Sequence, residues 1–427
     1  MLPGFARGEA LREEEGVPEA GEEEPTDLTY GGRFKVYAVA TEPHFVDHLA
    51  PVWKALPEEV RGTFYCGGNT VTPRRSLHQA IRFHGITEAC SGMPKKNYRG
   101  LGMTAASGDL NRMVRAAPNL RVVFFEHGCG LSYNRTQNSY AGARNRPHVD
   151  TFIFPNEISA SKQRAVHPDR RIEVIGSSPR LDPWANNLPK MSSPPVVALS
   201  FHWECQVVPE TRSSWYWYRK RLDTILDQGW TVIGHGHPRI IDTCELIYNQ
   251  YGIEVVRNFD DVMKRADVYC VDNSSTLYEF AATNRPVVVM NCPRYRQSAH
   301  HGLRFWDHLP GVESCGPDKA DNVRGIPLVD AIRKAIEDPR EVRKQRQDAV
   351  RHVYPHHDGH STERAVKIVL ETMLKSGEAN PPPEAWRPDT VYQVVVNGEI
   401  LRTDRPLFVA REAQMLAKKR GGVVQTI

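Results

Sequence analysis

The sequence lacks closely spaced cysteines. Its eight cysteines lie singly along 427 residues, and no two are within four positions of each other. This spacing excludes the C-x-x-C pairs of zinc sites and redox motifs. Single cysteines in a chain without a signal peptide are typical of free thiols in a reducing compartment, so we expect a cytoplasmic protein.

The chain also lacks long apolar runs and a strong charge of either sign. No apolar stretch approaches the roughly 20 residues that a membrane-spanning helix needs. With 55 basic and 51 acidic residues, the net charge of +4 is too small to indicate nucleic-acid binding. Residues 1–30 are rich in Glu and have no apolar core, so we expect a disordered acidic tail there rather than a signal peptide.

Short apolar strands that alternate with helical patterns dominate the rest of the chain, which predicts an α/β fold with parallel sheets. A first series, within a predicted domain 31–185, has strands at 34–40, 64–66, 121–125, 151–154 and 172–175. A second series, within a predicted domain 196–376, has strands at 196–200, 231–234, 253–256, 268–271 and 286–290.

The remaining segments are connectors and a small terminal module. Residues 183–195 hold four Pro and two Asn, which indicates a linker between the two domains. An amphipathic helix is expected near 214–228, and further helices at 328–338 and 361–375. Residues 388–427 predict a β-hairpin around Asn397-Gly398 followed by a helix.

The first candidate site motif follows the strand at 121–125. It consists of Glu126, His127 and Gly128. A His at a strand end can act as general base toward a hydroxyl, because its pKa lies near neutrality. Glu126 can orient it, and glycine allows the backbone to approach a ligand. A polar residue capping a strand before a glycine turn explains the same residues equally well.

The second motif follows the strand at 231–234. His237 or Arg239 can donate hydrogen bonds to a phosphate. His235 and His237 are spaced i, i+2, and the sequence shows no third ligand beside them. We therefore predict no metal site.

The third motif follows the strand at 268–271. Asp272 ends that strand and is a candidate residue for binding the donor, and Ser274 and Ser275 stand at the predicted start of a helix that carries Glu279. Hydroxyls and unpaired backbone N–H groups at a helix start bind phosphate. Glu279 can accept hydrogen bonds from the ribose or glycerol hydroxyls of a bound ligand. Ordinary capping of a helix by serine uses the same groups.

Arg180 forms a fourth candidate. It follows a predicted strand and the Pro179 turn, and it can reach a cleft between the domains. The alternative is a surface arginine paired with Asp182. Ligands of parallel α/β sheets bind outside the carboxyl ends of the strands, so all four motifs are expected to face one cleft.

Taken in order, these motifs resemble the CDP-glycerol glycerophosphotransferase family, the teichoic acid primases and polymerases. The resemblance spans about residues 120–375 and is most specific at Asp272-x-Ser274-Ser275 with Arg285-Pro286 downstream. It implies a GT-B fold and a reaction without metal or other cofactor. It implies that His127 is the base, that His237 is a second essential histidine, and that Ser274, Ser275 and Glu279 hold the donor together with Arg180.

The expected function is therefore transfer of a glycerol-phosphate or related group from a nucleotide-activated donor, such as CDP-glycerol, to a hydroxyl of a polymer, glycan or protein. Three alternatives remain open at this point: a GT-B glycosyltransferase using a UDP- or GDP-sugar, a nucleotide-sugar epimerase, and a nucleotide-sugar binding protein without turnover. The sequence also leaves room for peripheral contact with a membrane.

Overall fold

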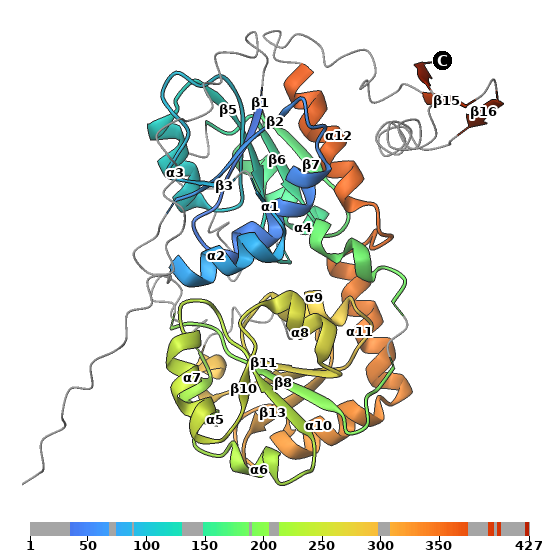
Figure 1. The fold of residues 1–427 in the computed structure, drawn as a ribbon. Coiled ribbons are helices and arrows are strands. Elements are labelled where there is room, and N and C mark those ends of the chain that lie inside the picture. The colour runs from blue at the N-terminus through green and yellow to red at the C-terminus, as the bar shows by residue number, and fades with distance from the viewer. Residues whose placement is uncertain are drawn as a thin grey trace, which may run out of the picture. The chain divides into compact units, whose positions relative to one another are not determined.

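The computed structural model describes residues 35–67, 74–87, 89–129, 148–187, 190–204, 213–297, 308–374, 392–396, 399–402 and 423–426. The predicted acidic tail and the predicted helix near 410–419 lie outside these ranges. Two seven-stranded sheets and one three-stranded sheet are formed, and Figure 1 shows helices on both sides of each seven-stranded sheet. The predicted α/β, GT-B-like fold class is confirmed.

The first sheet is wholly parallel and has the strand order β3-β2-β1-β4-β5-β6-β7. Alternate strand residues point to opposite faces, so Val36 and Ala38 enter one core and Tyr37 and Val39 the other. The strands are β1 (Lys35–Val39), β2 (Arg61–Cys66), β3 (Ala89–Ser91), β4 (Gly100–Thr104), β5 (Leu120–Phe125), β6 (Thr151–Phe154) and β7 (Arg171–Val174). The helices are α1 (Pro43–Ala55), α2 (Arg74–Phe83), α3 (Ser107–Ala116) and α4 (Glu157–Val166).

The second sheet, also parallel, repeats this order as β10-β9-β8-β11-β12-β13-β14. Its strands are β8 (Val196–Ser200), β9 (Thr231–Gly234), β10 (Glu254–Val255), β11 (Val268–Val271), β12 (Val287–Met290), β13 (Val312–Gly316) and β14 (Ile326–Pro327). Its helices are α5 (Trp215–Tyr218), α6 (Asp223–Leu226), α7 (Ile241–Gln250), α8 (Phe259–Arg265), α9 (Thr276–Ala281), α10 (Leu328–Glu337) and α11 (Arg340–Val353).

The last long helix, α12 (Ser361–Leu374), returns to the first sheet. Its apolar residues Val369 and Leu370 belong to the same buried core as Val36 and Leu49, and it packs against α1. Asp182 fixes its start, because the carboxylate accepts hydrogen bonds from the backbone N–H groups of Ser361 and Thr362 at 3.1 and 2.7 Å. The predicted second domain, 196–376, therefore ends in a helix that is buried against the first sheet.

Two details differ from the sequence prediction. The expected helix near 214–228 is split into the short helices α5 and α6. Arg221 lies in the break, and its carbonyl accepts a hydrogen bond from the hydroxyl of Thr224 in α6 at 2.7 Å, a local bond that competes with a continuous helix. Strands β3, β4, β13 and β14 were not expected, because they are short or rich in Gly and Ser.

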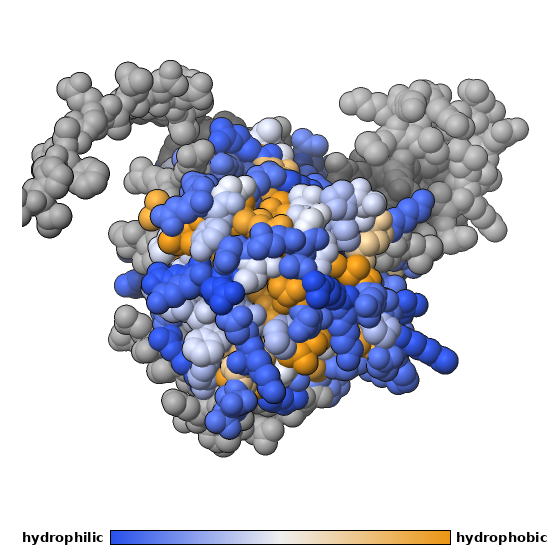
Figure 2. All heavy atoms as spheres, turned by 90° about the horizontal axis from the view of Figure 1, so that it is seen from below, coloured by the Kyte–Doolittle hydropathy of each residue, from blue (hydrophilic) through white to orange (hydrophobic). Residues whose placement is uncertain are grey.

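Near the C-terminus, β15 (Tyr392–Val396) pairs antiparallel with β16 (Glu399–Arg402) and with β17 (Val423–Thr426). The hairpin around Asn397-Gly398 is confirmed, and the third strand was not expected. Among the described residues, no helix combines the length and apolarity needed to cross a bilayer. On the face shown in Figure 2, hydrophobic residues occur in groups between hydrophilic ones.

Candidate active site

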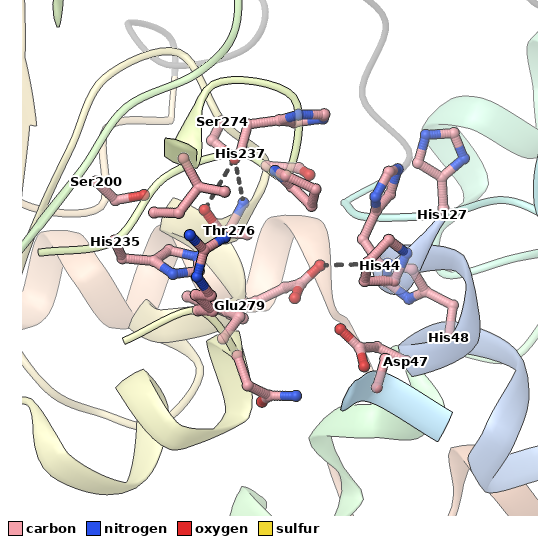
Figure 3. A pocket seen from close by; sticks show the side chains of 18 of the residues that line it. His44, Asp47, His48, His127, Ser200, His235, His237, Ser274, Thr276 and Glu279 are labelled. Atoms are coloured by element: carbon pink, nitrogen blue, oxygen red, sulfur yellow. Dashed lines mark hydrogen bonds and ion pairs between the residues drawn. The ribbon is translucent and has the colours of Figure 1, made fainter. Parts of the chain in front are cut away.

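A cavity lies between the two seven-stranded sheets, at the carboxyl ends of their strands. Its water-accessible volume is about 150 Å³, and it opens to solvent. All four predicted motifs reach it: His127 follows β5, His237 follows β9, and Ser274 and Ser275 follow β11. The fourth, Arg180, also lines the cavity. In Figure 3, His44, His48 and His127 line one side, and His235, Ser274 and Glu279 line the other.

His127 is held in one tautomer. Its Nδ1 lies 2.8 Å from the carbonyl oxygen of Ala105, which accepts only hydrogen bonds, so Nδ1 carries the proton. In the neutral ring the basic lone pair is then on Nε2. The sequence suggested Glu126 as the orienting group; Glu126 lines the cavity, but the carbonyl of Ala105 makes this contact.

His237 has the opposite tautomer. Its Nδ1 accepts a hydrogen bond from the backbone N–H of Arg239 at 3.1 Å, so the proton of the neutral ring is on Nε2. Burial, followed by the charges of neighbouring His44, His202 and Arg239, lowers the pKa of His237 well below its ordinary value. His237 is therefore a neutral hydrogen-bond donor at neutral pH.

The serine motif meets the first sheet directly. Gly128 has φ +70°, and a Cβ at this position would lie 2.3 Å from Ser275 Oγ. Only glycine tolerates both the left-handed backbone and this approach. The hydroxyl of Ser274 accepts from that of Thr276 at 2.9 Å. Since α9 has only six residues, hydroxyls and local N–H groups offer more to an anion here than a helix dipole does.

Arg180 lies at the centre of a buried ion network that joins the two halves of the cavity. Its guanidinium contacts Asp47 of α1 at 3.4 Å, Asp260 of α8 at 2.6 Å and Glu279 of α9 at 3.2 Å. Burial opposes its charge, but these carboxylates outweigh burial and keep the pKa of Arg180 above its ordinary value. Arg180 lines the cavity, as the sequence predicted, but its guanidinium is bound there by carboxylates. The alternative is wrong, because Asp182 is not its partner and binds the start of α12 instead.

Glu279 is the member of this network with an altered acidity. Burial raises its pKa to about 7, while Arg180 opposes that effect and Asp260 and Asp47 add to it. Its carboxylate lines the cavity, 3.8 Å from His48 Nε2. A carboxyl group in this setting changes its protonation near neutral pH.

Two predicted donor ligands, Asp272 and Arg239, are not among the residues that line the cavity. The Asp272 carboxylate accepts hydrogen bonds from the backbone N–H groups of His202 and Ser214, at 2.7 and 2.8 Å, and so anchors two loops. The Arg239 guanidinium pairs with Glu42 and stacks 4.4 Å from the Trp203 ring centre. Both residues support the site from outside it.

Four further histidines line the cavity, of which three were not predicted as site residues and one, His202, was only a weaker candidate for the donor site. These are His44 and His48 on α1, His202 after β8, and His235, whose Nδ1 donates to the Val256 carbonyl. Burial lowers the pKa of His44 to about 3 and that of His235 to about 4. His44 lies five residues after the end of β1, so the rule that ligands bind beyond strand ends could have found it.

Two groups of side chains have donor atoms close enough to hold a metal ion: Glu42 with His44 and His237, and Asp47 with His84 and Asp260. In each group, an arginine already pairs with at least one of the carboxylates. Arg239 pairs with Glu42, and Arg180 pairs with Asp47 and Asp260. We therefore assign no metal to either group of the described residues.

Comparisons with known proteins agree with this architecture. Residues 217–371 match the model of the CDP-glycerol:poly(glycerophosphate) glycerophosphotransferase family. A variant of the wall teichoic acid polymerase TagF matches at 15% identity and a TM-score of 0.52, over 82% of this chain and 90% of that one. S. aureus MnaA in complex with UDP matches at 14% identity and a TM-score of 0.52, over 82% and 100%. No curated protein matches in sequence.

Two facing parallel sheets with a histidine- and serine-lined cavity between their carboxyl ends are typical of the GT-B fold, and the family match of residues 217–371 indicates a transferase. Residues 217–371, which contain the serine motif, match the model of the CDP-glycerol:poly(glycerophosphate) glycerophosphotransferase family, and this match confirms the resemblance noted in the sequence. The solved structures, at 13–15% identity in the TagF group, show the shared fold alone.

Proposed function

We propose that this transferase moves a glycerol-phosphate group from a CDP-glycerol-like donor to an acceptor hydroxyl. The observation that carries the proposal is the convergence of His127, His237 and the Ser274-Ser275 pair on one cavity, with the last three inside the family match. A TagF variant was solved after soaking with CDPG, which supports a donor of this class.

In the proposed reaction, His127 Nε2 accepts the proton of the acceptor hydroxyl. The hydroxyl oxygen forms a bond to the glycerol-bearing phosphorus, and the bond from that phosphorus to the bridging oxygen breaks. CMP leaves with the bridging oxygen. Base catalysis by a positioned histidine accelerates such a step by about 10²–10⁴-fold.

The second half of the cavity holds the donor in this proposal. The Nε2–H of His237 and the hydroxyls of Ser274 and Ser275 donate to the diphosphate and stabilise the charge that develops on the leaving nucleotide. Glu279 faces the hydroxyls of the transferred group. These donors are neutral, and Arg180 and Arg239 are already paired with carboxylates. The proposed reaction uses no metal, as the family resemblance implies.

The test compares donors by thermal shift and by product analysis in the presence of EDTA. CDP-glycerol, CDP-ribitol, UDP-sugars and GDP-sugars are added to the full chain, and nucleotide release is followed by chromatography. We expect stabilisation and CMP release with CDP donors only. Replacing Ser274→Ala and Ser275→Ala together is expected to weaken the shift, whereas Ser161→Ala, an exposed serine on α4, is the matched control.

Other outcomes contradict the proposal in distinct ways. Turnover of UDP- or GDP-sugars alone would indicate a glycosyltransferase, and conversion of a nucleotide sugar without nucleotide release would indicate an epimerase. Stabilisation by a nucleotide that is never consumed would indicate a binding protein. Loss of activity in EDTA, restored by a divalent cation, would refute the metal-independent mechanism.

A further inference from the structure

His48 is a buried histidine whose ring contacts three separate parts of the site. It lies on α1 and is 6% exposed. Its Nε2 accepts the backbone N–H of Gly128 at 3.2 Å and lies 3.8 Å from a carboxylate oxygen of Glu279. Its Nδ1 faces the hydroxyl of Ser178 at 3.4 Å. The His48 ring thus joins α1, the loop after β5 and the turn before the second sheet.

These contacts fix the chemistry of the ring. An N–H group can only donate, so Nε2 of His48 must present its lone pair to Gly128, and the proton of the neutral ring is on Nδ1. The hydroxyl of Ser178 can accept that proton. If Nε2 were protonated, its N–H would point at the N–H of Gly128, and the two donors would repel each other. His48 is therefore held in the neutral form and is a poor acid or base.

The peptide that His48 binds is the one that follows His127. The loop is therefore held at two points: Ala105 holds the His127 ring, and His48 holds the next backbone N–H. Gly128 is in the left-handed region and lies directly against Ser275 of the second sheet. A shift of this turn would change the distance between the His127 base and the serines that face it.

We propose that His48 is a positioning residue, which sets the place of His127 relative to Ser275 by accepting the Gly128 N–H. This inference rests on the proposed function for its kinetic consequence, but the hydrogen bond itself has a readout that needs no substrate. His48 does not contact the reacting atoms in this role. Its loss is expected to slow transfer more than it weakens donor binding.

Two polar substitutions separate positioning from other roles. His48→Gln places a carbonyl oxygen near the position of Nε2, so it can still accept the Gly128 N–H. His48→Asn places its amide near the position of Nδ1, and this shorter side chain cannot reach the Gly128 N–H. His357→Asn is the matched control, because His357 bridges Ser177 and the Ala282 carbonyl with contacts of 3.2 and 3.1 Å but does not line the cavity.

We expect His48→Asn to lower kcat by about 10–100-fold, since misplacement by about 1 Å costs that much, with a smaller change in donor KM. His48→Gln should recover most of kcat. Hydrogen exchange of a peptide covering residues 120–129 should be faster in His48→Asn than in the native chain and His48→Gln, and unchanged in His357→Asn.

The exchange measurement keeps the two proposals distinct. If no donor is consumed by the native chain, the proposed function fails, and exchange alone decides the positioning role. Unchanged exchange in His48→Asn would overturn that role. Equal loss of kcat in the Gln and Asn variants, with native exchange in Gln, would also overturn it, because it would indicate that the imidazole itself acts in the chemistry.

Discussion

Replacing Arg180→Met removes the cation that three buried carboxylates share. The guanidinium is 3% exposed and lies within 3.4 Å of carboxylate oxygens on α1, α8 and α9. Methionine fills most of the same space without charge. Asp47, Asp260 and Glu279 then lose the guanidinium that they share, although Asp47 keeps its contact with His84 Nε2 at 2.9 Å. The two sheets also lose a contact that connects them.

The expected size follows from the burial of the network. Removing one partner of a buried ion pair costs about 3–5 kcal/mol, because the remaining charge is left uncompensated. For a protein unit of this size, each kcal/mol lowers Tm by about 2–4 °C, so the variant should melt roughly 6–20 °C below the native chain.

This loss should depend on pH. The folded pKa of Glu279 is already raised to about 7 from 4.5, chiefly by burial, and Arg180 limits that rise. A carboxyl group with a raised folded pKa binds its proton more tightly in the folded state, so its contribution to stability falls as pH rises from about 4.5 through 7. Without Arg180 the pKa rises further, and the variant should be impaired more at pH 8.5 than at pH 6.

Thermal unfolding of both proteins at pH 6, 7 and 8.5 tests this reasoning. Arg346→Met is the control, because Arg346 is equally buried but, among the described residues, its ion-pair partner is the single carboxylate Asp338, whose pKa is lowered. Its other contact is a hydrogen bond to the uncharged carbonyl of Asn284. Its loss should therefore be the same at all three pH values. An Arg180→Met deficit that does not change between pH 6 and 8.5 would refute the idea that the three carboxylates act as one uncompensated group.

Two further predictions concern the cavity. Gly128→Ala introduces a Cβ at φ +70° and 2.3 Å from Ser275 Oγ. We expect it to lower the free energy of unfolding by about 1–3 kcal/mol. Urea unfolding measures this, and a midpoint equal to that of the native chain would contradict it. His237 is neutral because its pKa is lowered well below 6.5, so its protonation cannot produce an acid limb near neutrality. His237→Gln should lower kcat/KM and leave the midpoint of that limb where it was; a displaced midpoint would show that His237 titrates in this range.

The strand-end motifs were predictable because parallel strands align their carboxyl ends at one edge of a sheet. A run of β-branched and aromatic residues marks β5, β9 and β11, and the polar residues that follow each of them are local in sequence. Their arrangement around one cavity then follows from two facing sheets. No pairing between distant residues had to be inferred for this part of the site.

Arg180 and Asp182 show where such reasoning stops. The sequence offers Asp182 as a partner because it is two positions away, but Asp182 binds the start of α12 instead. Arg180 instead bonds to Asp47 and Asp260, which are 133 and 80 residues away from it in the sequence. Charge pairs across two sheets depend on how the sheets face each other, and local periodicity carries no information on that.

The helix α1 hides its site residues for a different reason. The apolar residues Val46, Leu49 and Trp53 identify its core-facing side, and hydrophobic periodicity assigns no role to the other positions. His44 and His48, spaced i, i+4, share one side of the helix and reach the cavity. The strand order explains why this side of α1 faces the ligand site. In the first sheet the direction of the strand order reverses between β1 and β4, and in the second sheet it reverses between β8 and β11. Ligands bind at such points, so the segments after β1 and β8, which carry His44 and His202, face the cavity for topological reasons that no single motif reveals.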